Sequence, residues 1–223
     1  MSTLILTLAQ KKAILAPMKD DKSLPRRPYH HGDLSSALMD AAEEELKQCG
    51  IEGFSLRRVA KRAGVSHAAP AHHFGDVNGL LTALAAKGFE RLIQMQRDFR
   101  RRTPSNPRKQ IEASGVGYVV FALENPALFR LMFGSDRPDF GSVGLQRIAG
   151  SAFDELVSLV SAVTNDQGSP KCDGAMMIDV AAAWATAHGL ADLLAAGRLN
   201  TLGTLPANIR NRRIATIMSR AIA

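Results

Sequence analysis

Cysteine is scarce in this chain, which has only Cys49 and Cys172 among its 223 residues. The two lie far apart in the sequence, and neither has partners at the spacing of a metal site. Small secreted domains that depend on disulfides carry many more cysteines. A single disulfide remains an alternative, but a reducing cytoplasm is the compartment that we expect.

Long hydrophobic runs are also lacking. No uncharged apolar stretch approaches the ~20 residues that a helix needs to cross a bilayer. A short apolar run at residues 4–8 is followed, and not preceded, by lysines, which reverses the order of a secretory signal. We therefore expect no membrane span and no membrane partner.

Patterns typical of enzymes are missing as well. The sequence shows no nucleophile–base pair, paired carboxylates, phosphate-binding glycine loop or cluster of metal ligands. His72 and His73 are adjacent, and neighbouring helical side chains point about 100° apart, so the two are poorly placed to bind one ion. We expect a protein that is not an enzyme, with no catalytic residue, no metal site and no cofactor.

Positive charge, by contrast, is plentiful. Lysine and arginine number 28 against 21 aspartates and glutamates, a formal net charge of +7. This balance favours a polyanionic partner, although a basic protein without such a partner has the same composition. The hydrophobic fraction of 46% is typical of a globular chain with a sizeable core.

Residues 55–74 carry the clearest local pattern. Four apolar residues at positions i, i+3, i+4 and i+7 mark one face of a short helix: Leu56, Val59, Ala60 and Ala63. Ser55 is suited to cap that helix and Gly64 to end it. Ser66 is suited to cap a second helix, with Pro70 tolerated near its start. Since four cations fall on the outer face of the first helix, the pattern predicts a DNA-binding helix-turn-helix: Arg57, Arg58, Lys61 and Arg62.

Two motifs resemble the TetR family of bacterial transcriptional regulators. The first is the helix-turn-helix pattern together with YHHGDL at residues 29–34 before it and Asp76 and Leu80-Leu81 after it. The second is WATAHG at residues 184–189, which is similar to the Trp-x-x-x-His-Gly signature of one branch of that family. The resemblance covers residues 29 to about 200. In similar sequences the recognisable part begins near residue 29, so Met18 is a candidate start of translation.

The resemblance and the geometry of the major groove assign a set of DNA contacts. Phosphate contacts are expected from the N-terminal arm, the first helix and the start of the second, and base contacts from His67, Ala68, Ala69 and His72. The full predicted DNA-binding set is Tyr29, Ser55, Arg57, Arg58, Ser66, His67, Ala68, Ala69, His72 and His73.

The second helix departs from the family pattern. Ala71 stands where a tyrosine is usual and Val77 where a lysine is usual, and the helix has no Arg, Lys, Asn or Gln to bind a base edge with two hydrogen bonds. We therefore expect modest affinity with some dependence on DNA shape. An architectural or non-specific DNA-binding protein is the alternative.

The whole chain is predicted to be all-α, because no stretch shows convincing β alternation. We expect a basic N-terminal extension at 1–28, a three-helix DNA-binding domain at 29–75, a connecting helix at 76–102 and a helical regulatory and dimerisation domain at 103–223. Helices after the connecting helix are expected from Asn106-Pro107, from Asn125-Pro126, over about 142–164 and 174–197, and from about 206 to the end.

The second half is expected to bind a small apolar inducer and a second copy of the chain, as the resemblance implies. Plain core packing is the alternative for each ligand-binding residue, and a bond to a backbone carbonyl is the alternative for His188. The expected ligand-binding residues are Phe129, Met132, Phe133, Met177, Trp184 and His188. The expected dimer interface contains Ala181, Ala185, Leu190, Leu193 and Leu194.

These expectations combine into one hypothesis. The chain is predicted to be a cytoplasmic transcriptional regulator, a repressor, that binds a palindromic operator in double-stranded DNA as a homodimer. A small molecule bound in the second half would release it from DNA.

Overall fold

The computed structural model describes residues 31–164 and 174–221, and all regular structure within them is helical. The all-α prediction is confirmed. The extension at 1–28, Met18, Tyr29 and Cys172 lie outside the described residues. The helices are α2 His31–Cys49, α3 Leu56–Ala63, α4 Ala69–Phe74, α5 Val77–Arg101, α6 Pro107–Glu124, α7 Pro126–Phe133, α8 Val143–Thr164, α9 Gly174–Ala195, α10 Asn200–Gly203 and α11 Ala207–Ala221.

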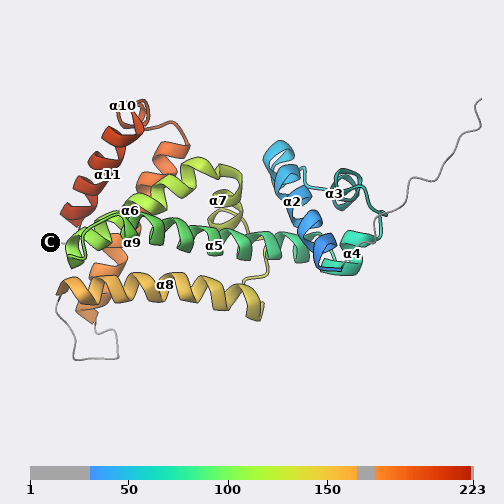
Figure 1. Cartoon of the computed structure of the whole chain (residues 1–223), viewed down its shortest axis with the longest axis horizontal. Helices are drawn as coiled ribbons and strands as arrows, with labels where there is room; N and C mark the ends of the chain where they lie inside the picture. Colours follow the sequence, from blue (N-terminus) through green and yellow to red (C-terminus); the bar gives the residue numbers. More distant parts are fainter. Residues whose placement is uncertain (1–30, 165–173, 222–223) are drawn as a thin grey trace, which may run out of the picture. The chain divides into compact units, whose positions relative to one another are not determined.

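The chain divides into two units, Met1–Leu34 and Ser35–Ala223. Within the second unit, the long helix α5 connects α3 and α4 to the helices of the second half of the chain (Figure 1). It contacts α4 near its start and α6, α7 and α8 further along. A single helix therefore joins the short N-terminal helices to the helices of the second half.

The ends of several helices follow from local side-chain chemistry. Asp76 precedes α5, and its carboxylate accepts a hydrogen bond of 2.8 Å from the backbone N–H of Gly79. Asn106 caps α6 in the same way, at 3.2 Å from the N–H of Lys109, and Pro107 takes the first helical position. Gly64 ends α3 in the left-handed conformation, with φ of 68°.

α6 lies at the centre of the second half. Every residue from Ile111 to Ala122 is buried, and α5, α8, α9 and α11 all contact the helix. Most of these residues are apolar, and a helix that is apolar around most of its surface belongs in an interior. Gly117 allows α5 to come close, because a Cβ atom there would lie 2.8 Å from the Cα atom of Gln96.

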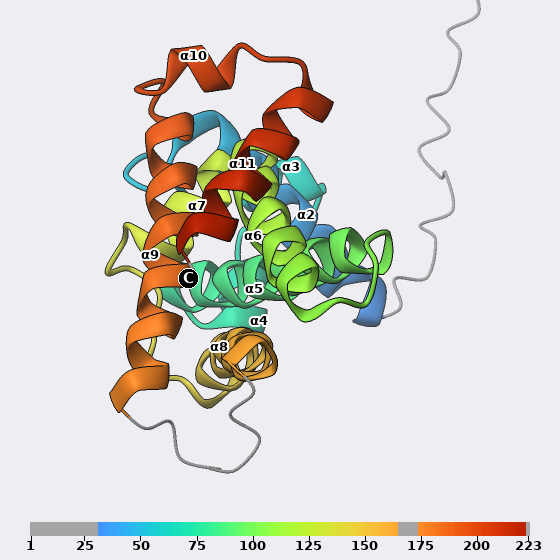
Figure 2. The ribbon, with the colours of Figure 1, turned by 90° about the vertical axis from the view of Figure 1, so that its left-hand side faces the viewer.

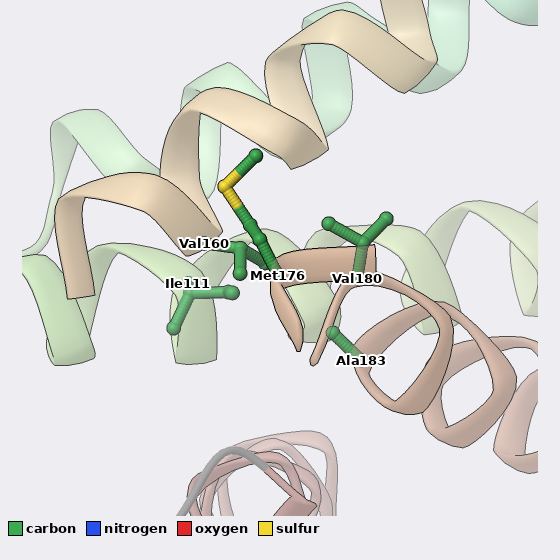
Figure 3. Packing of buried hydrophobic residues seen from close by; sticks show 5 residues of the cluster. All are labelled: Ile111, Val160, Met176, Val180 and Ala183. Carbon is green, nitrogen blue, oxygen red and sulfur yellow. The ribbon is translucent and has the colours of Figure 1, made fainter. Parts of the chain in front are cut away.

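The remaining helices cover α6 from several sides. α9 packs beside α11 and also contacts α8 (Figure 2). One apolar cluster joins α6, α8 and α9 (Figure 3). Its buried members are Ile111, Val160, Met176, Val180 and Ala183.

Two local expectations differ from the structure. α4 begins at Ala69 rather than just after Ser66, and neither Ser55 nor Ser66 makes a capping side-chain bond. Proline has no N–H and is tolerated only in the first turn, so Pro70 delays the start of α4. The short helix α10 was not predicted.

Among the described residues, no single helix is long and apolar enough to cross a membrane. α6 and α7 pass that test only as a pair, and they are bent by 109° at their junction.

Candidate functional site

The helix-turn-helix presents a short, weakly polar second helix. His67 and Ala68 lie in the turn before α4, and with His72 they are exposed. Ser66 is also exposed, whereas Ala69 and His73 are half-buried. Pro70 is buried and anchors the helix. The predicted base-reading residues are therefore accessible, but His67 and Ala68 project from a turn and not from the helix.

The basic face of α3 separates into two pairs. Arg58 and Arg62 are bound to α2, where Arg58 donates to the carboxylate of Glu45 and Arg62 donates to Gln48 at 2.7 Å. Arg58 also donates to the carbonyl of Gly53, in the turn between α2 and α3. Arg57 and Lys61 are exposed, and the ion pairs of the described residues do not include them. Arg57 and Lys61 are thus the α3 cations most available to phosphate.

Glu45 is the buried counter-charge that holds α3 against α2. Its side chain has no exposed surface, and it pairs with Arg58 and, at 3.5 Å, with Arg62. The hydrogen bond from Arg58 to this carboxylate raises the pKa of the guanidinium. Breaking a buried pair leaves an uncompensated charge, so this contact fixes the position of α3.

A second charged cluster joins α2 to the second half of the chain. Arg91 on α5 binds both carboxylate oxygens of Glu43, at 2.8 and 2.9 Å. It also donates to Asn125 Oδ1 at 3.0 Å, at the junction of α6 and α7. The hydrogen bonds from Arg91 lower the pKa of Glu43 to about 2 despite burial, with a further contribution from Lys47.

A cavity of about 270 Å³ lies among α5, α6, α7, α8, α9 and α11. Its eighteen lining residues include six aromatic side chains and no charged one. The volume is slightly below the ~300–1,000 Å³ of typical ligand pockets, so the cavity suits a small apolar molecule. The aromatic lining residues are Phe89, Tyr118, Phe133, Phe140, Phe153 and Trp184.

Besides the indole N–H of Trp184, three polar side chains line this cavity: Gln96, Ser114 and Tyr118. Gln96 Nε2 donates to Ser114 Oγ at 3.0 Å. Tyr118 OH is hydrogen-bonded to His188 Nδ1 at 2.8 Å. Burial raises the pKa of Tyr118 well above its usual range, and a hydrogen bond from Trp184 opposes that shift only in part. The phenol therefore stays neutral at any physiological pH.

The predicted ligand-binding residues fall into three places. Met132, Phe133 and Trp184 line the cavity. Phe129 and His188 line a separate hollow of about 140 Å³, in which Phe133 also takes part. Met177 lines none of the described hollows and is 37% exposed, whereas its neighbour Met176 is the methionine that packs in the core.

The outer face of α9 carries the exposed apolar residues expected of an interface. Ala181 and Ala185 are exposed and Leu193 is 38% exposed, whereas Leu190 and Leu194 are buried within the chain. Further large apolar side chains extend the same face at helical spacing. The exposed apolar stripe of α9 consists of Met177, Ile178, Ala181, Trp184 and Ala185, and Leu193 lies beside it, about 80° around the helix from Ala185.

Neither the hydrogen-bonding pair in the cavity nor the two charged clusters were predicted from the sequence. For the hydrogen-bonding pair the sequence offers one signal. Gln96 is a polar residue at i+4 from Leu92, and it interrupts an otherwise apolar helix face. Glu43 and Glu45 were not singled out, since glutamates on a helix are usually solvated.

Comparison with known families gives two matches in the expected order. Residues 38–84 match the family described as bacterial regulatory proteins of the tetR family. Residues 111–217 match the family described as the tetracyclin repressor-like C-terminal domain. Together the matches cover the helix-turn-helix and, from residue 111 to residue 217, most of the helices around the cavity.

A curated relative agrees over the N-terminal part. The HTH-type transcriptional regulator BetI of Paraburkholderia phytofirmans is 36% identical over 76 residues, which are 34% of this chain. The match spans 39% of that relative's length. The families and this relative are regulators and not enzymes.

Solved structures agree over most of the chain. A protein of unknown function from Rhodococcus sp. RHA1 is 34% identical, with a TM-score of 0.71 over 87% of this chain and 98% of the other. The TetR family transcriptional regulator PfmR from Thermus thermophilus has a TM-score of 0.60 at 15% identity, over 82% and 97% of the two chains. At 15% identity, the likeness to PfmR shows only that the two chains share a fold.

Proposed function

This chain belongs to the TetR family of bacterial transcriptional regulators and carries its helix-turn-helix domain, and we propose that it is a repressor that a small molecule releases from DNA. The observation that carries the proposal is the double role of α5. The helix contributes Phe89, Leu92 and Gln96 to the cavity wall, and it packs against α4 at its other end.

DNA binding is assigned to the exposed residues around α4 and to α3. His67, Ala68 and His72 are accessible for base edges, and Ala69 stands beside them. We assign phosphate contacts to Arg57 and to the polar groups of Ser55, Ser66 and His73, and also to Tyr29 and Arg58. Because Arg58 is already paired with Glu45, we expect its contribution to be smaller than that of Arg57.

Release by a ligand requires differential binding to two conformations. A molecule in the cavity touches α5, α6 and α7 together, and Arg91 connects these helices to α2 through Asn125 and Glu43. A shift at the junction of α6 and α7 would therefore reach the DNA-binding helices through this cluster.

Dimerisation is proposed through the exposed apolar stripe of α9. Palindromic operators are read by two copies of a helix-turn-helix, and a self-complementary apolar face is the usual basis of such a pair. Ala181 and Ala185 allow close approach, and Ile178, Trp184 and Leu193 add apolar area. Leu190 and Leu194 support the face from inside.

Several finer assignments are part of the same proposal. We assign residues 29–75 to the DNA-binding domain, 76–102 to the connecting helix and 103–223 to the regulatory domain. We also propose a cytoplasmic location, where the DNA lies, and membership of the branch with the Trp-x-x-x-His-Gly signature.

The test is a mobility-shift titration with DNA from upstream of the protein's own gene. We expect a discrete complex of dimer size that survives excess competitor DNA and weakens with salt. Arg57→Ala should weaken binding to operator and competitor alike, because the lost contact is to phosphate. A smear that competitor abolishes would contradict the proposal.

Non-specific or architectural binding is the second candidate function, favoured by two exposed alanines, one in the turn before α4 and one in α4. Ala68 and Ala71 offer methyl groups but no hydrogen bond to a base. The same titration separates the two functions, since only a regulator discriminates its operator from competitor.

A further inference from the structure

The cavity wall specifies the charge of its ligand. None of its eighteen residues is Asp, Glu, Lys, Arg or His, and none stands in the first four residues of a helix, so helix N-terminal amides do not line it either. An ion transferred into such a site loses its hydration without gaining a counter-charge. That loss amounts to several kcal/mol per ion.

The nearby charged groups do not change this conclusion. Glu112 is buried on α6, but its carboxylate is paired with Lys109 at 2.8 Å and does not line the cavity. Arg97 and Arg100 both bind Glu155, likewise outside the wall. The aromatic rings would attract a cation, but a desolvated cation–π contact is worth about 2 kcal/mol or more, which offsets only part of the several kcal/mol of lost hydration.

The polar groups of the wall specify the ligand's hydrogen bond. Tyr118 OH is occupied by His188. The pair formed by Gln96 and Ser114 is not: among the hydrogen bonds of the described residues, none uses Gln96 Oε1 and none has the Ser114 hydroxyl as donor. The pair therefore offers one acceptor and one donor to a bound molecule.

The size of the cavity limits the occupant. At ~30 Å³ per water, a volume of about 270 Å³ corresponds to about nine waters, or roughly ten non-hydrogen ligand atoms. Six aromatic side chains favour a flat ring system among molecules of this size.

We propose that the cavity binds uncharged, ring-bearing molecules with a single hydroxyl, which Gln96 and Ser114 hold, and that it rejects carboxylates and ammonium ions of the same skeleton. This inference rests on the proposed role of the cavity as the ligand site, and it adds the chemical class of the ligand.

The test uses four compounds that share one skeleton: naphthalenemethanol, methylnaphthalene, naphthoate and naphthylmethylammonium. Binding to the full chain is measured by calorimetry at neutral pH, and the alcohol is expected to bind at least ~10-fold more tightly than either ion. The hydrocarbon should bind up to ~10-fold more weakly than the alcohol, because it lacks the hydrogen bond.

Two glutamine variants test the assigned contact. Gln96→Leu should make the alcohol and the hydrocarbon bind equally, while Gln94→Leu on the same helix should preserve their difference. Gln94 is exposed, binds Asp98 and does not line the cavity, so it is the matched control. The variants' melting temperatures are recorded to show that both fold.

Each outcome bears on the inference. If either ion binds as tightly as the alcohol, or if no compound binds, the inference is overturned. If Gln96→Leu preserves the preference for the alcohol, the assignment to Gln96 is wrong. If the alcohol binds as expected but leaves DNA affinity unchanged in the mobility-shift assay, the inference stands and release by a ligand is contradicted.

Discussion

Glu45 shows how one buried residue supports a binding surface that it does not join. Its carboxylate lies wholly inside the protein and pairs with both Arg58 and Arg62, which reach the surface from α3. Arg58 and Arg62 therefore each have an internal partner, Glu45, in addition to any DNA phosphate that they contact at the surface.

Glu45→Ala should lower the free energy of unfolding by about 2–4 kcal/mol. The expected loss is below the upper values for buried pairs, because both arginines can reach water after the change. Urea denaturation measures it, with Glu52→Ala as the control, since Glu52 is exposed and should change stability by less than ~0.5 kcal/mol. Equal effects of the two substitutions would contradict the role of Glu45.

Glu43 predicts a dependence of stability on pH. Its pKa falls from 4.5 to about 2 in the folded chain, chiefly because Arg91 donates hydrogen bonds to the carboxylate. The folded state thus binds fewer protons than the unfolded state, and the stabilisation is present above pH ~4.5 and is lost as the pH falls towards 2.

The check is a series of unfolding measurements across that acidic range. Glu43→Gln should be less stable than the unchanged chain at neutral pH, and the difference should shrink as the pH falls. A difference that stays constant from neutral pH to pH ~2 would show that the pair with Arg91 does not set this pKa.

At the scale of elements, the close contact between α5 and α6 depends on Gly117, which has no side chain to keep the two helices apart. Gly117→Ala places a methyl group 2.8 Å from the Cα atom of Gln96, so the two helices must separate. We expect a loss of about 1–3 kcal/mol in the free energy of unfolding. Ligand binding should weaken too, because Gln96 lines the cavity.

Gly150→Ala on α8 is the matched control. A Cβ atom at Gly150 meets nothing within 4 Å, so the substitution should be neutral or stabilising by up to ~1 kcal/mol through helix propensity alone. If both variants lose stability equally, the close approach of α5 and α6 is not the cause.

Helix boundaries could be predicted from the sequence where a single residue decides them. Asp76, Asn106 with Pro107, and Gly64 each fix a helix end by a local bond or conformation, and each stands where it was expected. α4 was misplaced because Pro70 outweighed Ser66 as the signal for its start.

The candidate site could be predicted only in part. The apolar side chains of the second half, together with the resemblance, predict Met132, Phe133 and Trp184 as ligand-binding residues, and all three line the cavity. Periodicity shows which face of a helix is buried. It does not show which buried residues leave space between them, so Gln96 and Ser114 were not. It also does not separate neighbours, so Met177 was chosen although Met176 is the buried one.

At the scale of the whole molecule, the outer face of α9 predicts the oligomeric state. Ile178→Glu puts a charge in the exposed apolar stripe, at a side chain that is 69% exposed. Because a desolvated unpaired charge costs several kcal/mol, the dimer should dissociate and operator affinity should fall. Sedimentation velocity measures the first effect and mobility shift the second.

Val143→Glu is the control for this prediction. Val143 is 81% exposed and apolar but lies at the start of α8, away from the stripe. This variant should remain dimeric, so a chain that stays dimeric with Ile178→Glu, or that dissociates with Val143→Glu, would place the interface elsewhere.

Because α5 is long, a small tilt of the helix at the cavity would displace its start by several ångströms, as the proposed release mechanism requires. From Gln96 in the cavity wall to Val77 at its start, the helix rises about 28 Å, at 1.5 Å per residue. A tilt of about 7° around Gln96 would then move the first turn of α5 by about 3.5 Å, close to the ~3.4 Å rise of one base pair. If a ligand in the cavity tilts α5 by this amount, α4, which contacts the start of α5, would move out of register with the double helix by about one base pair.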